Sequence, residues 1–312
     1  MKSNSFDIKQ LTGRIGAEIL GLDLTKELTK DLIRDIRQTL LQYKVIFFRN
    51  QNLDAQGQIS FARNFGEVTK AHPTAPSLPD HPEVFDLNYN KTTNYANNWH
   101  TDTTFLDRPP LGSILRILEV PPVGGDTLWA NTVTAYQDLP IHLRCLADQL
   151  WAVHTNANNY VTPAINLANE AINFRTIPDS NNRYETLHPV VRVHPESGER
   201  GLFIDEFVHY IQGLSTSESI NLVQLFQSYV TRPENTVRWR WQLGDIAFWD
   251  NRVTQHYAIA DYGNHARRVQ RVTIAGDIPV NIEGKPSVVI KGDSSEFTQY
   301  NTPNFIGAKT VE

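Results

Sequence analysis

Residues 113–130 read SILRILEVPPVGGDTLWA, and this stretch decides the fold class that we expect. Residues 113–119 and 126–130 are rich in β-branched, aromatic and large apolar side chains, which favours two short strands. Between them, Pro121-Pro122-Val123-Gly124-Gly125 has the composition of a turn. Similar short runs, bounded by glycine and proline, recur along the chain. The pattern is typical of a double-sheet β-sandwich or jelly roll with helices packed outside.

The same patterns predict the remaining elements. We expect further strands at 44–49, from Trp99 onward, and at 188–194, 202–205, 236–242, 245–250 and 267–275. Apolar positions at helical spacing predict helices at 26–43, 54–65, 133–150, 164–175 and 217–230. Residues 70–98 are rich in proline, asparagine and aspartate, and they predict a long loop.

Composition narrows the class of protein. The chain has 312 residues and a net charge of −5, with no block of lysine and arginine, so we expect no nucleic-acid partner. Apolar runs such as residues 45–48 are far shorter than the ~18 residues that span a bilayer, so we expect no membrane partner. Cys145 is the single cysteine, and residues 1–7 lack an apolar signal core. These features predict a cytoplasmic protein.

No repeat or linker divides the sequence, so residues 1–312 are expected to form a single domain. Within it we expect active-site loops near 70–98 and 156–186. The single cysteine also excludes a metal site built from several thiolates within this chain.

The stretch Trp99-His100-Thr101-Asp102 indicates a metal site. Residues two apart in a strand project from the same face, so His100 and Asp102 could reach one metal ion. Among the ten histidines, His256 has the best context for a third ligand, because it follows an apolar strand. Two histidines and a carboxylate that leave positions open are typical of non-haem Fe(II) oxygenases. A hydrolase that uses a divalent ion to activate water is the alternative from another class, and a non-catalytic anion-binding protein is a third.

Arginines near the C-terminus suggest the anions that such a site would take. A 2-oxo acid that chelates iron needs a partner for its distal carboxylate, which Arg267 could bind in a bidentate pair and Thr127 could assist. If residues 267–273 form a strand, Arg267 and Arg271 share one face. Buried arginines are costly unless each meets an anion, so Arg271 predicts a second anion on the main substrate.

Taken together, these residues resemble the taurine dioxygenase family of Fe(II)/2-oxoglutarate-dependent oxygenases. The resemblance extends from about Leu11 to Pro279 and includes the runs 45–51, 98–105, 124–131, 188–200, 234–241 and 244–257. It implies a mixed α and β protein with a double-stranded β-helix (jelly-roll) core and flanking helices. It also implies Fe(II) held by His100, Asp102 and His256, and 2-oxoglutarate held by Thr127 and Arg267, with O₂ as co-substrate and no catalytic residue beyond the metal ligands. Members of the family are usually dimers or tetramers.

Within this family the sequence is most similar to the alkylsulfatases, through the runs 113–116, 128–132, 150–154 and 234–239. That resemblance implies a small anionic substrate, a sulfate ester or a sulfonate, held by His72 and Arg271. Ala75 and Ala96 stand where taurine enzymes have polar residues, which favours a more apolar substrate. The expected reaction cleaves alkyl sulfate esters to aldehyde and sulfate, with succinate and CO₂ as co-products. A sulfonate dioxygenase that releases sulfite and a phenoxyalkanoate-type carboxylate dioxygenase are the alternatives.

Overall fold

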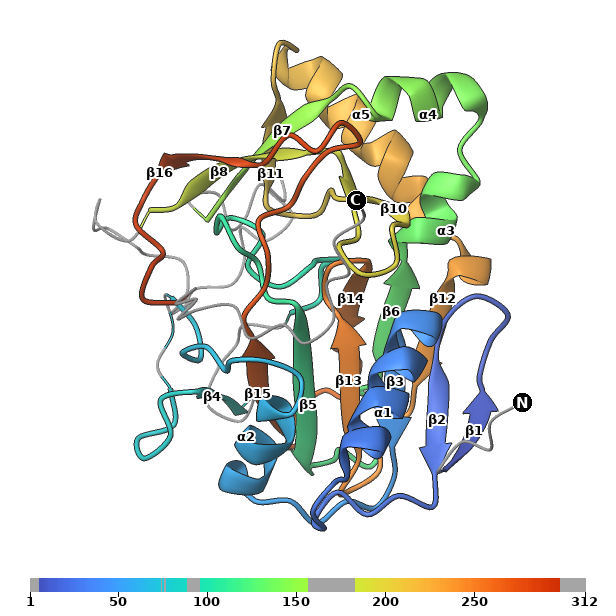
Figure 1. Cartoon of the computed structure of the whole chain (residues 1–312), viewed down its shortest axis with the longest axis vertical. Coiled ribbons are helices and arrows are strands. Elements are labelled where there is room, and N and C mark those ends of the chain that lie inside the picture. The colour runs from blue at the N-terminus through green and yellow to red at the C-terminus, as the bar shows by residue number, and fades with distance from the viewer. Residues whose placement is uncertain (1–5, 74, 76, 89–95, 157–182, 298–312) are drawn as a thin grey trace.

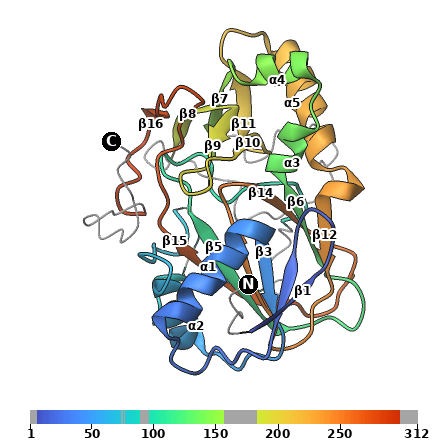
Figure 2. The same cartoon turned by 45° about the vertical axis from the view of Figure 1, so that its right-hand side comes forward.

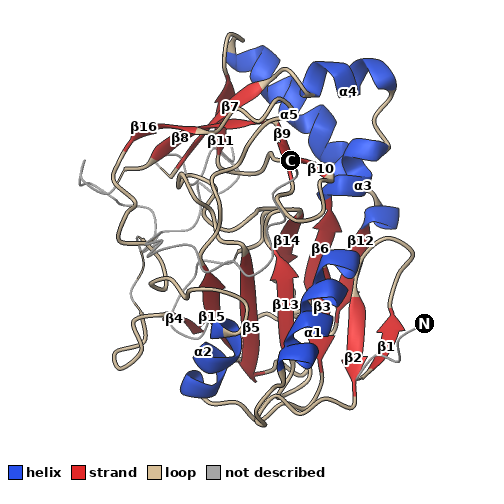
Figure 3. Ribbon diagram, in the orientation of Figure 1, coloured by secondary structure: helices blue, strands red, loops and turns tan. Residues whose placement is uncertain are grey.

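Short strands make up much of the chain in the computed structural model, which describes residues 6–73, 75, 77–88, 96–156 and 183–297 (Figure 1). The strands are β1 (Asp7–Gln10), β2 (Ala17–Leu20), β3 (Val45–Phe48), β4 (Val84–Asn88), β5 (Gly112–Glu119), β6 (Thr127–Asn131), β7 (Trp151–Thr155), β8 (Glu185–Pro189), β9 (Val191–Val193), β10 (Arg200–Leu202), β11 (Val208–Ile211), β12 (Thr236–Trp239), β13 (Ile246–Asp250), β14 (Thr254–Ala258), β15 (Arg268–Ile274) and β16 (Val288–Lys291). The helices are α1 (Lys30–Tyr43), α2 (Ala55–Arg63), α3 (Thr132–Gln137), α4 (Ile141–Ala147), α5 (Thr216–Val230) and the 3₁₀ helix η2 (Pro233–Asn235). The expectation of a mixed α and β protein is confirmed (Figure 3).

Within the described residues, the strands form four sheets. The largest has seven strands in the order β1-β2-β3-β13-β5-β15-β4. A three-stranded sheet has the order β12-β6-β14, a four-stranded sheet has the order β11-β7-β8-β16, and β9 pairs with β10. The residues expected to carry function come from the seven-stranded and three-stranded sheets and from the segments beside them.

The alternation of side chains in β3 explains how the layers pack. Val45 and Phe47 point into a core shared with the three-stranded sheet, where the ring of Phe47 stacks on that of Trp239 at a centroid distance of 4.1 Å. Ile46 and Phe48 point to the other side, into a core that α1 and α2 cover. Both faces of this strand are buried, which is why residues 45–48 form a continuous apolar run. Figure 1 shows α1 and α2 lying over the large sheet.

A further apolar core lies at the end of the molecule where α3, α4 and α5 gather (Figure 2). Phe226 and Val230 of α5 are fully buried there, against Ala152 of β7 and Ile211 of β11. None of the helices in the described part of the chain is long and apolar enough to cross a bilayer.

Several predicted boundaries differ from the structure. The first helix begins at Lys30 rather than near residue 26, because the Thr29 side chain caps it by accepting a hydrogen bond from the Leu32 N–H at 3.2 Å. The helix expected at 133–150 is two helices, since Pro140 stands at the N-cap of α4. The turn at 121–125 joins strands of two different sheets.

Residues 70–98 are not a loop throughout. They contain β4, which pairs with β15 in antiparallel register, with Phe85 opposite Arg271. The sequence pattern also does not predict the short strands β7, β11, β14 and β16. Residues 89–95 and 157–182 lie outside the described residues, and with them lie the expected helix at 164–175 and parts of both expected active-site loops.

Candidate active site

His100, Asp102 and His256 lie together, and all three are buried. Each can offer one ligand atom such that these atoms all lie within 4.8 Å of one another. Nε2 of His100 is 4.0 Å from Oδ1 of Asp102, and Nε2 of His256 is 3.8 Å from the same oxygen. The structure therefore brings together the three residues that the sequence selected as metal ligands.

The backbone brings them together in a way that the sequence did not predict. His100 and His256 form an isolated β-bridge, in which the His100 N–H donates to the His256 carbonyl at 3.0 Å and the His256 N–H donates back at 2.7 Å. After His100 the chain turns, and Thr103 has a φ of +49°. The prediction that His100 and Asp102 share one face of a strand is wrong, because the turn delivers Asp102.

Asn251 fixes the backbone of Asp102 in this turn. Its side-chain carbonyl accepts a hydrogen bond from the Asp102 N–H at 2.9 Å, and its amide donates to the Asp102 carbonyl at 3.2 Å. Asp205 holds the same turn from another side, since its carboxylate accepts from the Thr101 N–H at 3.3 Å and from the Thr104 hydroxyl at 2.9 Å. The turn is thus held by buried side chains from two distant segments.

The two imidazoles are oriented differently. Nδ1 of His100 lies 2.8 Å from the Asn98 carbonyl, which can only accept, so this nitrogen carries a proton and Nε2 is the ring nitrogen that faces Asp102. The His256 ring packs beside Trp249, with ring centroids 4.9 Å apart, and Nδ1 of His256 has no hydrogen-bond partner among the described residues. Burial, together with the neighbouring His100, holds the pKa of His256 well below its usual range, so this imidazole is neutral.

Asp102 is ionised in spite of its burial. Burial alone would raise its pKa, but Arg271, the two imidazoles and a hydrogen bond from Ser113 outweigh burial and lower the pKa to about 2. The Ser113 hydroxyl donates to Oδ2 of Asp102 at 2.6 Å, and the Arg271 guanidinium contacts Oδ1. Two imidazoles and an ionised carboxylate, with no thiolate beside them, form a donor set that fits a divalent first-row metal such as Fe(II).

Thr127 and Arg267, the residues predicted to hold a 2-oxo acid, also lie together. Arg267 precedes β15 and is 2% exposed, and its Nη2 lies 3.5 Å from the Thr127 hydroxyl oxygen. The same oxygen accepts a hydrogen bond from the indole N–H of Trp241 at 2.9 Å. Thr127 is two residues along β6 from Trp129, which pairs with His256 of β14. The pair is therefore attached to the same three-stranded sheet as one of the metal-ligand candidates.

The predicted alternation of side chains along β15 holds at Arg271. Val269 packs in the core between the two sheets, and Arg271, on the same side, reaches Asp102. Arg268 and Gln270 alternate to the other side, where both bind Asp86 at about 3 Å (3.0 and 2.9 Å).

His72 lies near Arg271 on the same side of the site. Its ring stacks on Phe85 with centroids 5.2 Å apart, and the Arg271 guanidinium carbon lies 5.3 Å from the centroid of that same ring. Burial, then the nearby positive charge of Arg271, lower the pKa of His72 to about 3. The imidazole is therefore neutral at physiological pH, and in that state one ring nitrogen donates and the other accepts a hydrogen bond.

Sequence reasoning missed the residues that support the site. Ser113, Asn251 and Asp205 each bond to Asp102 or to its turn from a distant position in the chain. Glu206, whose pKa is raised by burial, lies with Oε1 3.8 Å from Nδ1 of His100. Of these residues, only Ser113 could have been predicted to face the interior from the sequence. The alternation of β5 puts it on the same face as the core residues Leu115 and Ile117.

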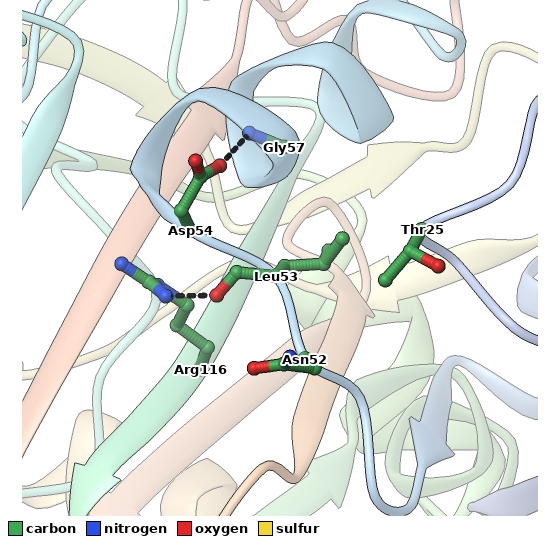
Figure 4. A pocket seen from close by; sticks show the side chains of 6 residues that line it. All are labelled: Thr25, Asn52, Leu53, Asp54, Gly57 and Arg116. Carbon is green, nitrogen blue, oxygen red and sulfur yellow. Dashed lines mark hydrogen bonds between the residues drawn. The ribbon is translucent and has the colours of Figure 1, made fainter.

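A hollow of about 570 Å³ lies by the start of α2, and none of the predicted site residues lines it (Figure 4). Arg116 of β5 lines it and donates to the Leu53 carbonyl, while Asp54 caps α2 by accepting from the Gly57 N–H at 2.6 Å. Arg116 alternates with Leu115 and Ile117, which face the core between the sheets, so this hollow is on the helix-covered face of the sheet.

Comparison with known proteins gives consistent results. The model of the taurine catabolism dioxygenase TauD, TfdA family matches residues 7–273. An alpha-ketoglutarate-dependent sulfate ester dioxygenase of Pseudomonas putida is 48% identical over 282 residues, 90% of this chain and 93% of that protein. An alkylsulfatase of Acinetobacter baylyi is 46% identical over 283 residues, 90% of this chain and 89% of that protein. The crystal structure of a taurine dioxygenase from Burkholderia xenovorans matches with a TM-score of 0.80 and 38% identity, over 93% of this chain and 96% of that one.

Proposed function

Because this chain belongs to the taurine catabolism dioxygenase TauD, TfdA family, we propose that it is an Fe(II)- and 2-oxoglutarate-dependent dioxygenase that cleaves alkyl sulfate esters. The products are an aldehyde and sulfate from the ester, and succinate and CO₂ from 2-oxoglutarate. The observation that carries the proposal is the buried cluster of His100, Asp102 and His256 with Arg271 directly beside it. The expected resemblance to the family and its alkylsulfatase members is confirmed by the two relatives.

Each residue has a separate role in this proposal. His100, Asp102 and His256 would hold Fe(II) through three ligand atoms, a number that leaves ligand positions free for the co-substrates. Arg267 and Thr127 bind the distal carboxylate of 2-oxoglutarate (alpha-ketoglutarate), and their burial strengthens that ion pair. Bound Fe(II) and 2-oxoglutarate supply the activation of O₂ that hydroxylates a C–H bond of the substrate. The protein contributes position and charge.

Arg271 and His72 place the carbon that is attacked. The guanidinium binds the sulfate group, and the neutral His72 donates a further hydrogen bond to it. Phe85, whose ring lies near both side chains, helps to exclude water from the head group. Since Arg271 contacts Asp102, a sulfate held by Arg271 leaves its ester carbon close to the metal-ligand candidates. Hydroxylation of that carbon gives a product that collapses to aldehyde and sulfate.

The proposal extends to the architecture around the site. We propose that the seven-stranded and three-stranded sheets form a jelly-roll core, supported by the apolar core that they share. We also propose that residues 1–312 form one catalytic domain, that the cytoplasm is its location, and that the enzyme is a dimer or tetramer.

The test is anaerobic reconstitution with Fe(II) and 2-oxoglutarate, followed by O₂ and a substrate panel. The panel contains hexyl sulfate, taurine, hexanesulfonate and a phenoxyalkanoate, and succinate is quantified together with sulfate, sulfite and phenol. Succinate matched by sulfate supports the proposal. Succinate matched by sulfite would indicate a sulfonate dioxygenase, and succinate matched by phenol a carboxylate dioxygenase. If 2-oxoglutarate is not consumed with any substrate, the dioxygenase proposal is wrong.

A further inference from the structure

Thr103, the residue after Asp102, combines two unfavourable features. Its φ of +49° lies in the left-handed region, where a β-branched residue is strained. It is only 7% exposed, and its hydroxyl oxygen has no hydrogen-bond partner among the described residues. Strained residues and unsatisfied buried polar atoms are both uncommon in folded proteins, and both concentrate at functional sites. A ligand that accepts a hydrogen bond from the Thr103 hydroxyl would account for both features.

The surroundings of Thr103 indicate the charge of that ligand. Thr103 and Arg271 line the same cavity, and Arg271 is also only 7% exposed. Nε of Arg271 is buried and has no hydrogen-bond partner among the described residues. By contrast, the hydroxyls of Thr69 and Thr273 on the same cavity wall bond to each other at 2.6 Å. A hydroxyl and a guanidinium N–H are thus left as donors, and an oxyanion would satisfy both.

We propose that the Thr103 hydroxyl donates a hydrogen bond to a terminal oxygen of the substrate's sulfate group, next to Arg271. The inference rests on the proposed function and adds a residue that determines specificity. A sulfate ester has three terminal oxygens, and Arg271, His72 and Thr103 supply three separate donor groups. A carboxylate has two oxygens, so it gains less from the third donor.

A purely structural role would not need this side chain. Valine has nearly the same shape and would fill the same space without burying an unpaired hydroxyl. Asparagine or glycine would adopt the left-handed backbone with less strain. Removing the hydroxyl should therefore leave the folded protein as stable as before or more stable, whereas removing a structural hydrogen bond would destabilise it.

The test compares Thr103→Val with Thr103→Ser, since the second keeps the hydroxyl. We expect Thr103→Val to raise KM for hexyl sulfate about tenfold with kcat and the KM for 2-oxoglutarate within about twofold, because a hydrogen bond that aids binding uniformly affects KM alone. Thr103→Ser should stay within about threefold of the wild type. For heptanoate, a carboxylate of similar length, the affinity should change by less than about twofold. The melting temperature of Thr103→Val should equal or exceed that of the wild type.

Equilibrium binding separates this inference from the proposed function. Hexyl sulfate is titrated calorimetrically into the protein loaded with Mn(II) and N-oxalylglycine, which does not turn over. About tenfold weaker binding by Thr103→Val supports the inference even if the wild type releases no sulfate, a result that would refute only the proposed function. Equal affinity of wild type and Thr103→Val, absence of binding to the wild type, or a lower melting temperature with an equal loss of 2-oxoglutarate affinity would overturn it.

Discussion

Replacing Ser113 by alanine should weaken Fe(II) binding by about 10- to 100-fold. The Ser113 hydroxyl donates to Oδ2 of Asp102 at 2.6 Å, and both side chains are almost completely buried. A hydrogen bond to a charged group contributes about 1.5–3 kcal/mol, and each 1.4 kcal/mol is about tenfold in affinity. The bond also turns the carboxylate so that Oδ1 faces the two imidazoles. Loss of a partner behind a metal ligand typically costs a similar factor.

The assay is anaerobic titration of the metal-free protein with Fe(II) against a competing chelator, alongside thermal unfolding. Ser219→Ala is the matched control, because Ser219 of α5 is also buried and its hydroxyl oxygen accepts from the Ile211 N–H of β11 at 3.0 Å. The control should lose thermal stability while its Fe(II) affinity stays within about twofold of the wild type. If Ser113→Ala binds Fe(II) as tightly as the control, the reasoning about Asp102 orientation is refuted.

Three further predictions concern the anion-binding residues. Arg267→Lys keeps the charge but loses the planar pair of donors, so KM for 2-oxoglutarate should rise about 10- to 100-fold in steady-state kinetics with kcat nearly unchanged; an unchanged KM would remove Arg267 from the site. Because burial and Arg271 hold the pKa of His72 at about 3, its imidazole is neutral from pH 6 to 8, and KM for hexyl sulfate should be flat over that range. A KM that rises about tenfold per pH unit above 6.5 would show that His72 must be protonated. The unfolded chain protonates His72 near pH 6.5, so this residue should lower the free energy of unfolding as pH falls from about 6.5 to 3.

The sequence selects candidate ligands that lie together in the structure, but it does not predict how the backbone brings them together. His100, Asp102 and His256 were chosen from residue chemistry and family spacing, and they do converge. The local argument for His100 and Asp102 assumed a strand, whereas the structure has a single bridge followed by a turn. Alternation worked for Arg271, because β15 is a regular strand from Val269 onward and parity applies within it.

The supporting residues could not be predicted because their partners are distant in the chain. Asn251 reaches the backbone of Asp102 from the end of β13, and Asp205 reaches Thr101 from the segment after β10. Neither residue belongs to a periodic sequence pattern, since each acts through one side chain in a segment without regular secondary structure. The same holds for β4, whose pairing with β15 depends on the register of the whole sheet. Local periodicity contains no information about such contacts.

Arg271 connects the proposed metal site with the proposed substrate site. Its guanidinium contacts Oδ1 of Asp102, the oxygen nearest to both imidazoles, and the same group is proposed to bind the sulfate. Sulfate and Asp102 compete for the guanidinium of Arg271. If Arg271 binds the sulfate instead, the negative charge of Asp102 is no longer partly neutralised by Arg271 and would attract Fe(II) more strongly. Hexyl sulfate should therefore tighten Fe(II) binding. Linkage requires Fe(II) to tighten hexyl sulfate binding by the same factor, which for a typical coupling is about 5- to 150-fold. Anaerobic titrations in both orders measure it, and Arg271→Gln should abolish it. Affinities that are independent of each other in the wild type would show that Arg271 does not connect the two sites.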